Sequence, residues 1–178
     1  MKIELKIIGL RAHKGHTSNH SPSGSIPMHK LNNKSFLMGQ VGFVFGDENV
    51  AIPGLNYLPD LYADVFLRRL NQVLLELKND NVTDLYMDYH YDQGEPLYLF
   101  SRKDNDLTIS IVEDEGKGER WNFTCSYDAF VRSCNEAFEK VRELLVQHAG
   151  SKGEKFYQEQ IICNYGKDDP NVLLGIKE

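Results

Sequence analysis

The stretch RWNFTCSYDAFVRSCNEAFEKVRELLVQH, residues 120–148, decides the fold. From Trp121 to Cys125 every second residue is apolar and the residues between them are polar, which is the pattern of a strand with one buried face. Ser126 stands where a helix N-cap is needed, and Asp128 places a negative charge in the first turn. The stretch therefore predicts a strand that leads directly into a helix.

The predicted helix has one apolar face and one charged face. Arg132 and Glu136, and then Glu136 and Lys140, are opposite charges four residues apart, and each such pair stabilises a helix by about 0.2–0.5 kcal/mol. Apolar residues recur at three- and four-residue spacing on the other side. They are Phe130, Cys134, Ala137, Phe138, Val141, Leu144 and Leu145.

Three further strands precede this stretch and complete a four-stranded antiparallel meander. The connectors between the segments contain turn residues at lengths that hairpins use. The expected strands are Asp84 to Tyr91, Pro96 to Arg102, Leu107 to Val112 and Glu119 to Ser126. Alternation places Leu85, Met87, Leu97, Leu99, Leu107, Ile109, Ile111, Trp121 and Phe123 on one face, and Tyr86, Asp88, His90, Tyr98, Phe100, Thr108, Ser110, Asn122 and Thr124 on the other.

The first part of the chain adds two strands, Lys2 to Gly9 and Ser35 to Phe45, with a short partner strand at Asn49 to Ile52. Residues 11–34 between them have no periodicity and predict a long polar loop. An amphipathic helix is expected from Asp60 to Lys78.

After the central stretch we expect a second, shorter helix from Lys152 to Cys163 and a tail over residues 166–178. This order of elements indicates a single α+β domain, residues 1–178, in which an antiparallel meander carries two main helices on one face.

The chain of 178 residues is long enough to form a core without disulfides, and its hydrophobic fraction of 41% is ordinary for a soluble protein. The N-terminus resembles neither a signal peptide nor a membrane span, so we expect a cytoplasmic location. Cys125, Cys134 and Cys163 have no metal-binding spacing, and we expect the first two to be buried core residues.

Charge is distributed unevenly along the chain. The net charge of −6 argues against binding to nucleic-acid phosphates. Residues 79–119 contain eleven acidic and three basic residues, a net −8, whereas residues 1–34 contain six basic residues and Glu4, a net +5. The acidic segment is also rich in tyrosine.

Tyrosines supply large contact areas, and carboxylates attract a basic protein while repelling nucleic acid. The sequence thus predicts a protein-binding surface without catalytic residues or cofactor, on the second sheet face and its turns. Its residues are Asp84, Tyr86, Asp88, His90, Tyr91, Asp92, Tyr98, Glu113, Asp114 and Glu115. The same tyrosines could instead form cross-strand pairs of an ordinary soluble sheet.

An alternative is a small metal-binding protein or metal-dependent enzyme. Asp84, Asp88 and His90 share one face of their strand and could form an acid–base or metal site. The segment from His13 to His29 contains several imidazoles that could bind a divalent metal. A solvated sheet face and a polar loop explain the same residues.

The segments LYMDYHY, residues 85–91, and SYDAFVRSCNEAFEKV, residues 126–141, with the meander between them, resemble small bacterial immunity proteins that neutralise polymorphic toxins. The similarity covers residues 51–148 and lies mainly in the order of elements. It implies a cytoplasmic inhibitor that covers a toxin domain, often through acidic residues when the toxin is a basic nuclease.

Overall fold

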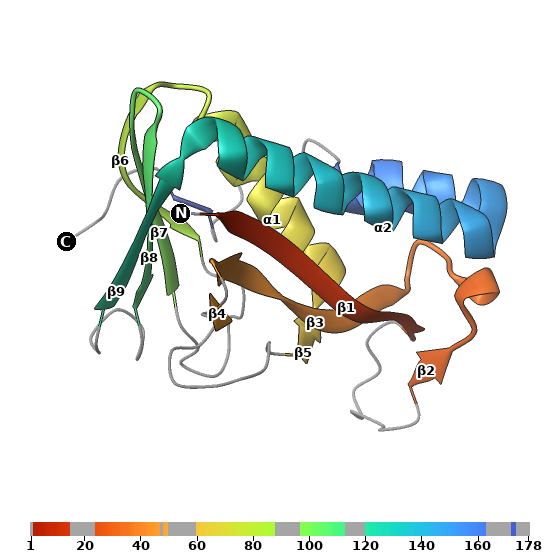
Figure 1. Ribbon diagram of the computed structural model, residues 1–178. Coiled ribbons are helices and arrows are strands. Elements are labelled where there is room, and N and C mark those ends of the chain that lie inside the picture. Colours follow the sequence, from red (N-terminus) through yellow and green to blue (C-terminus); the bar gives the residue numbers. More distant parts are fainter. Residues whose placement is uncertain are drawn as a thin grey trace.

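Two antiparallel sheets and two main helices form the fold seen in the computed structural model (Figure 1). The structure describes residues 2–14, 24–46, 48–49, 60–87, 97–112, 120–162 and 172–173.

The first sheet, sheet A, is built from the N-terminal strands β1 (Ile3–His13) and β3 (Phe36–Phe45), which pair along most of their length. Short strands complete it in the order β2–β1–β3–β4, with β5 also paired to β3. They are β2 (Ser25–Ile26), β4 (Glu48–Asn49) and β5 (Asp60–Tyr62).

The second sheet, sheet B, contains the expected meander. Its strands are β6 (Asn81–Met87), β7 (Leu97–Lys103), β8 (Asp106–Val112) and β9 (Arg120–Ser126), paired in chain order. A fifth strand, β10 (Val172–Leu173), pairs with β6 on the outer edge. The part of the chain that we expected to be a tail therefore contributes to the sheet.

Helix α2 (Tyr127–Phe156) begins where its local signal places it, and helix α1 (Ala63–Glu76) begins a few residues after the position expected. Helix α1 lies within the expected range, and α2 starts directly after β9. The Ala129 N–H donates to Ser126 Oγ at 3.1 Å, which confirms Ser126 as the N-cap. A π-helical turn, η3 (Tyr157–Ile161), extends α2, and a 3₁₀ turn, η1 (Met28–Lys30), follows β2.

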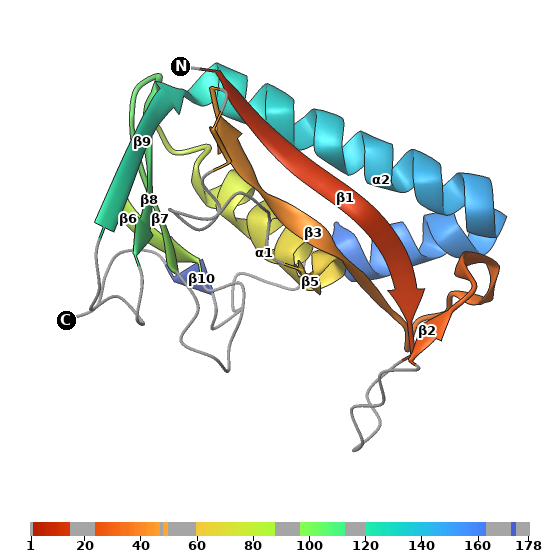
Figure 2. The same cartoon turned by 60° about the horizontal axis from the view of Figure 1, so that its bottom comes forward.

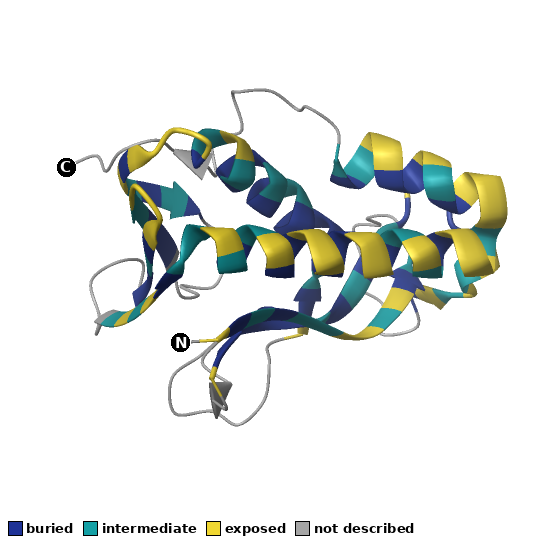
Figure 3. Cartoon of the chain, turned by 45° about the horizontal axis from the view of Figure 1, so that its top comes forward, coloured by how far each residue is buried: buried dark blue, intermediate teal, exposed yellow. Residues whose placement is uncertain are grey.

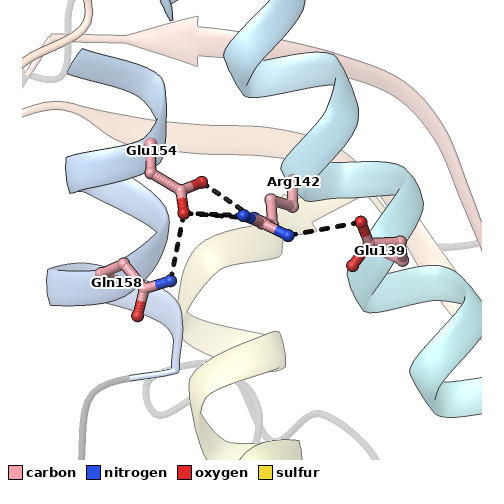
Figure 4. Close-up of polar contacts among 4 residues, drawn as sticks. All are labelled: Glu139, Arg142, Glu154 and Gln158. Carbon is pink, nitrogen blue, oxygen red and sulfur yellow. Dashed lines mark hydrogen bonds and ion pairs between the residues drawn. The ribbon is translucent and has the colours of Figure 1, made fainter. Parts of the chain in front are cut away.

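Helix α2 consists of two segments, as the sequence predicted, because Gly150 interrupts it with a non-helical backbone (φ 55°). The second segment turns back beside the first. Arg142 bonds both carboxylate oxygens of Glu154 across the pair, with Nε–Oε2 and Nη2–Oε1 distances of 2.9 Å (Figure 4). Gly153 lies so close to the carbonyl of Leu145 that a Cβ atom there would overlap it. The hairpin thus depends on a glycine at each of two positions.

Helices α1 and α2 cover the same face of sheet A, and sheet B stands across one end of this layer (Figures 1 and 2). The α+β class, the antiparallel meander and the packing of the helices on one sheet face are confirmed, although the sheet that they mainly cover is sheet A and not the meander. The structure adds that the N-terminal strands form a sheet of their own instead of joining the meander.

An aromatic cluster joins all of these elements. Phe43 of β3 lies 6.2 Å from Phe66 of α1, 5.7 Å from Tyr98 of β7 and 5.8 Å from Phe130 of α2, measured between ring centroids. Phe100 packs against Phe130 at 5.8 Å. All five rings are fully buried, so both sheets and both helices share one hydrophobic core.

Two further expectations for the fold need correction. Residues 11–34 are not wholly a loop, because β1 continues to His13, and β2 and η1 follow. The helix expected from Asp60 begins at Ala63, since the residues before it form β5.

Cys125 and Cys134 are buried as expected, and burial raises the pKa of the Cys125 thiol to about 11.

We expect Phe43→Ala to lower the free energy of unfolding by about 3–5 kcal/mol, because it removes the ring that contacts both helices and both sheets. Leu75→Ala, at a side chain that is 38% exposed on α1, is the control and should change stability by about 0.5 kcal/mol or less. Urea denaturation measures both. Equal losses in the two variants would contradict the central role of Phe43.

Gly153→Ala should lower the free energy of unfolding by about 1–3 kcal/mol, because the added methyl group forces the two segments of α2 apart. Ser151→Ala, at an exposed position of the same segment, should leave stability nearly unchanged. Thermal unfolding of both variants tests this. An unaltered melting temperature for Gly153→Ala would show that the close approach is not required.

Candidate functional site

The structure describes three of the ten residues of the predicted partner-binding surface: Asp84, Tyr86 and Tyr98. The other seven lie outside the described residues. They are Asp88, His90, Tyr91, Asp92, Glu113, Asp114 and Glu115. What the structure places is therefore the framework from which these residues extend.

A β-bulge in β6 brings Asp84 and Tyr86 to the outside of sheet B. The register shifts between Val82 and Leu85, so both of these apolar residues reach the core although three positions separate them. Asp84 adopts a left-handed backbone (φ 48°), and its N–H donates to Ser101 Oγ at 2.9 Å. The Ser101 hydroxyl in turn donates to Asp84 Oδ1 at 3.1 Å. Asp84 and Tyr86 are half-buried and oriented away from the core, as predicted.

Tyr98 was assigned to the wrong face. It is fully buried, with its ring 5.7 Å from Phe43 and 6.1 Å from Phe66, and burial raises the pKa of its phenol. Phe100 lies on the same core face. Because β7 reads Leu-Tyr-Leu-Phe, both of its faces are apolar and alternation cannot choose between them. Tyr98 is a core residue and does not contact a partner in this fold.

The outer face of sheet B is not an open polar surface either. Leu99, Ser110 and Val112 are buried on it, and the Ser110 hydroxyl donates to Asn122 Oδ1 at 2.6 Å. Towards the β9 edge, Asn122 and Thr124 are exposed. The centre of this face is thus covered, and the polar surface is confined to its margins.

The register of sheet B places two strand ends close to each other. Met87 pairs with Tyr98, and Val112 pairs with Leu97, so β6 and β8 end at the same end of the sheet. From these two points the sequence continues into residues 88–96 and 113–119, which contain seven acidic residues and one lysine, a net −6. The two most acidic connectors of the chain therefore leave from neighbouring positions.

Among the described residues, the histidines and cysteines do not gather into a cluster of metal-ligating side chains. No group of three or more His, Cys, Asp or Glu that could hold a metal ion occurs in the part of the chain that the structure describes. His13 is half-buried with Nδ1 3.0 Å from the Lys14 carbonyl oxygen, and His29 is exposed on η1. His90 and Asp88 of the alternative acid–base group lie outside the described residues.

A surface groove that the sequence did not predict runs between β1 and α2. It consists of two adjoining hollows of about 320 and 420 Å³, which share Glu4, Leu5, Ala137 and Lys140. On the β1 side of the groove, the Ile8 side chain is 49% exposed, which is unusual for a large apolar residue. Ile8 falls within the strand expected from Lys2 to Gly9, and nothing in the sequence predicted a groove beside it.

Asp64 is the most perturbed carboxyl group among the described residues, but it has a structural role. It is almost completely buried in the first turn of α1, and its Oδ1 accepts a hydrogen bond from the Leu37 N–H of β3 at 3.3 Å. Burial raises the pKa of Asp64 to about 6, although the Leu37 N–H and the charge of Arg68 oppose the shift. The carboxyl group therefore joins α1 to sheet A.

The raised pKa of Asp64 makes stability depend on pH. The folded state favours the protonated carboxyl group of Asp64. The contribution of this group to the free energy of unfolding is therefore highest below pH 4 and falls as the pH rises through about 6. Asp64→Asn keeps an acceptor for Leu37 without the charge. We expect it to raise the free energy of unfolding by about 2–3 kcal/mol at pH 7 and to leave it unchanged at pH 4.

Denaturant unfolding of Asp64→Asn at both pH values checks this expectation. Asp80→Asn, at an exposed carboxylate, is the control and should not alter the pH dependence. A loss of stability at pH 7 in Asp64→Asn would show that the charged carboxylate is needed.

No helix within the described ranges is long and apolar enough to cross a membrane. Comparison of the chain with protein-family models, curated proteins and solved structures gave no match.

Proposed function

We propose that the protein is a non-enzymatic binding protein, an immunity-type inhibitor that binds a basic toxin domain. The observation on which this proposal rests is the position of the β6 and β8 ends. Met87 and Val112 lie at the same end of sheet B, and each leads into an acidic connector. Asp84 and Tyr86 lie on the outside of β6 just before this end.

A concentrated negative charge serves a binding protein in two ways. It attracts a basic partner from a distance and raises the rate of association. It also repels nucleic acid, so a nuclease domain could be covered while its substrate is kept away. The acidic connectors supply most of this charge, because residues 88–96 and 113–119 alone contribute a net −6.

The strands that support the connectors are held firmly, which a binding surface requires. β7 pairs with β8 over seven consecutive residue pairs, and β8 pairs likewise with β9. Tyr98 and Phe100 fix β7 to the core from beneath. Burying Tyr98 therefore anchors the end of the sheet even though it removes one tyrosine from the proposed surface.

Charge reversal tests the proposal. Asp88→Lys, Asp92→Lys and Glu113→Lys, combined in one variant, should weaken binding to the basic partner by about tenfold or more and reduce its salt dependence. The measurement is the association rate and affinity for the partner purified from extracts of the source organism. In cells of the source organism that express the toxin, the wild-type chain should restore growth, whereas the charge-reversal variant should not.

The matched control reverses the same amount of charge elsewhere. Glu139, Glu143 and Glu159 are exposed on α2 and η3, and the Glu139–Arg142 ion pair at 3.5 Å is too exposed to matter much for stability. Lysine at these three positions should leave affinity nearly unchanged. If the control and the variant bind equally well, the acidic connectors are not the binding surface.

A further inference from the structure

Helix α2 reverses direction at a single residue. Gly150 has φ 55° and ψ −131°, a backbone conformation that glycine adopts readily and other residues avoid, whereas the rest of α2 is helical. Residues 151–162, which we call the C-terminal arm, run back from this point beside the first segment of α2 (Figure 3). The position of the arm on its own chain therefore depends on the backbone of one glycine.

The C-terminal arm has an apolar side that belongs to the hydrophobic core. Phe156, Tyr157 and Ile161 are buried, whereas Lys155 and Glu159 on the other side are exposed. A helix of this length is marginal by itself in water, and the burial of its apolar side chains is what stabilises it. The arm thus needs the core of a folded chain to lie against.

Two polar contacts fix the direction of the arm on this core. Glu154 accepts a hydrogen bond from Arg142 of the first segment of α2, with an Nη2–Oε1 distance of 2.9 Å. Nearer the end of the arm, the Gln160 carbonyl oxygen accepts from Arg68 Nη1 of α1 at 3.0 Å. The docking site of the arm is therefore matched to one occupant, a segment of this sequence.

Nothing in the neighbouring sequence prevents α2 from continuing straight through the turn. Residues 147–155, QHAGSKGEK, contain neither proline nor a β-branched side chain. The residues on both sides of Gly150 are already helical, so helical dihedral angles at this one position would join the two segments into a single rod. A straight α2 would carry the arm away from Arg142 and from α1 of its own chain.

A second copy of the chain offers the docking site that a straight α2 leaves empty. The arm of each copy then lies on the core of the other, where the same contacts form between chains as form within one chain in the monomer. Strand β10 follows the arm along the chain and passes with it to β6 of the second copy. Monomer and dimer therefore differ mainly in the backbone of Gly150 and in the entropy of association, and exchange of this kind is a low-cost route to a dimer.

We propose that the C-terminal arm is exchanged between two copies of this chain, which form a dimer when Gly150 becomes helical. Glycine favours the monomer for two reasons, because it adopts the turn without strain and is a poor helix former. A Cβ atom at position 150 would meet no atom within 4 Å, so another residue would change this balance through the backbone alone. The exchange does not depend on the proposed function.

Gly150→Ala tests the hinge. Alanine is strained at φ 55° but is the best helix former, so the dissociation constant of the dimer should fall by about tenfold or more in analytical ultracentrifugation of the full chain. Gly9→Ala is the matched control, because Gly9 also has a positive φ (66°) and open space at its Cβ position but lies in β1. The control should lose stability and remain as monomeric as the wild type.

Lengthening the hinge should reverse the effect. With Gly-Gly-Ser inserted between residues 150 and 151, the chain turns back without a strained residue, and the Gly150→Ala variant should become monomeric again. A dimer that survives the insertion forms through another surface and contradicts arm exchange. A Gly150→Ala variant that is folded and as monomeric as the wild type contradicts it as well.

Exchange at the wild-type hinge is tested with two charge variants that compensate each other. Arg142→Glu and Glu154→Arg each place like charges together within one chain, whereas an exchanged pair of the two variants restores an Arg–Glu contact at both docking sites. When the two variants are unfolded and refolded together at high concentration, they should form a mixed dimer in preference to a dimer of either variant.

The control for this mixing experiment uses Glu143→Lys and Lys152→Glu, at exposed positions of the two segments of α2, and should show no preference for a mixed dimer. Because both charge variants keep Gly150, the mixing experiment decides the question even if Gly150→Ala does not fold. Absence of the mixed dimer overturns the proposal.

Discussion

The contact of Phe43 with rings from three other elements is the constraint on which the rest of the structure depends. Phe66 comes from α1, Tyr98 from β7 and Phe130 from α2, and each ring lies about 6 Å from Phe43. Rings at such distances and tilts add specific attraction to the burial of their area. Because one residue of β3 touches both helices and sheet B, the angle between the two sheets and the position of α2 above β1 are set together. The acidic end of sheet B and the groove beside β1 are thus held in one rigid arrangement.

Helix α2 takes part in both the core and the surface of the molecule. Its buried residues, from Phe130 to Leu145, pack on the sheets, and the flank beside β1 forms one wall of the groove. Ser133 connects the helix to the first sheet, because its hydroxyl accepts a hydrogen bond from the Leu5 N–H of β1. The return segment after Gly150 adds the Arg142–Glu154 pair, with distances of 2.9 Å, and holds the far end of α2 in place. The wall of the groove is therefore supported along its length.

The acidic connectors and the basic residues beside β1 have opposite charge and lie on different sheets. The acidic connectors follow β6 and β8 of sheet B, whereas Lys2 and Lys6 lie on β1 of sheet A. This arrangement gives a structural meaning to the uneven charge of the sequence, in which residues 1–34 have a net +5 and residues 79–119 a net −8.

The sequence by itself determined the type and order of the main elements. The alternation in β9, the Ser126 cap and the spacing of apolar residues in α2 act between neighbours along the chain, so the strand, the meander and the helix could be predicted from residues a few positions apart. Tertiary structure alone decided which face of β7 is buried, that β1 and β3 form a second sheet, and that residues 172–173 join β6. It also decided that Ile8 lies beside a groove. These outcomes depend on contacts between residues far apart in sequence, such as Phe43 with Tyr98 and Leu5 with Ser133, and local periodicity contains no information about such contacts.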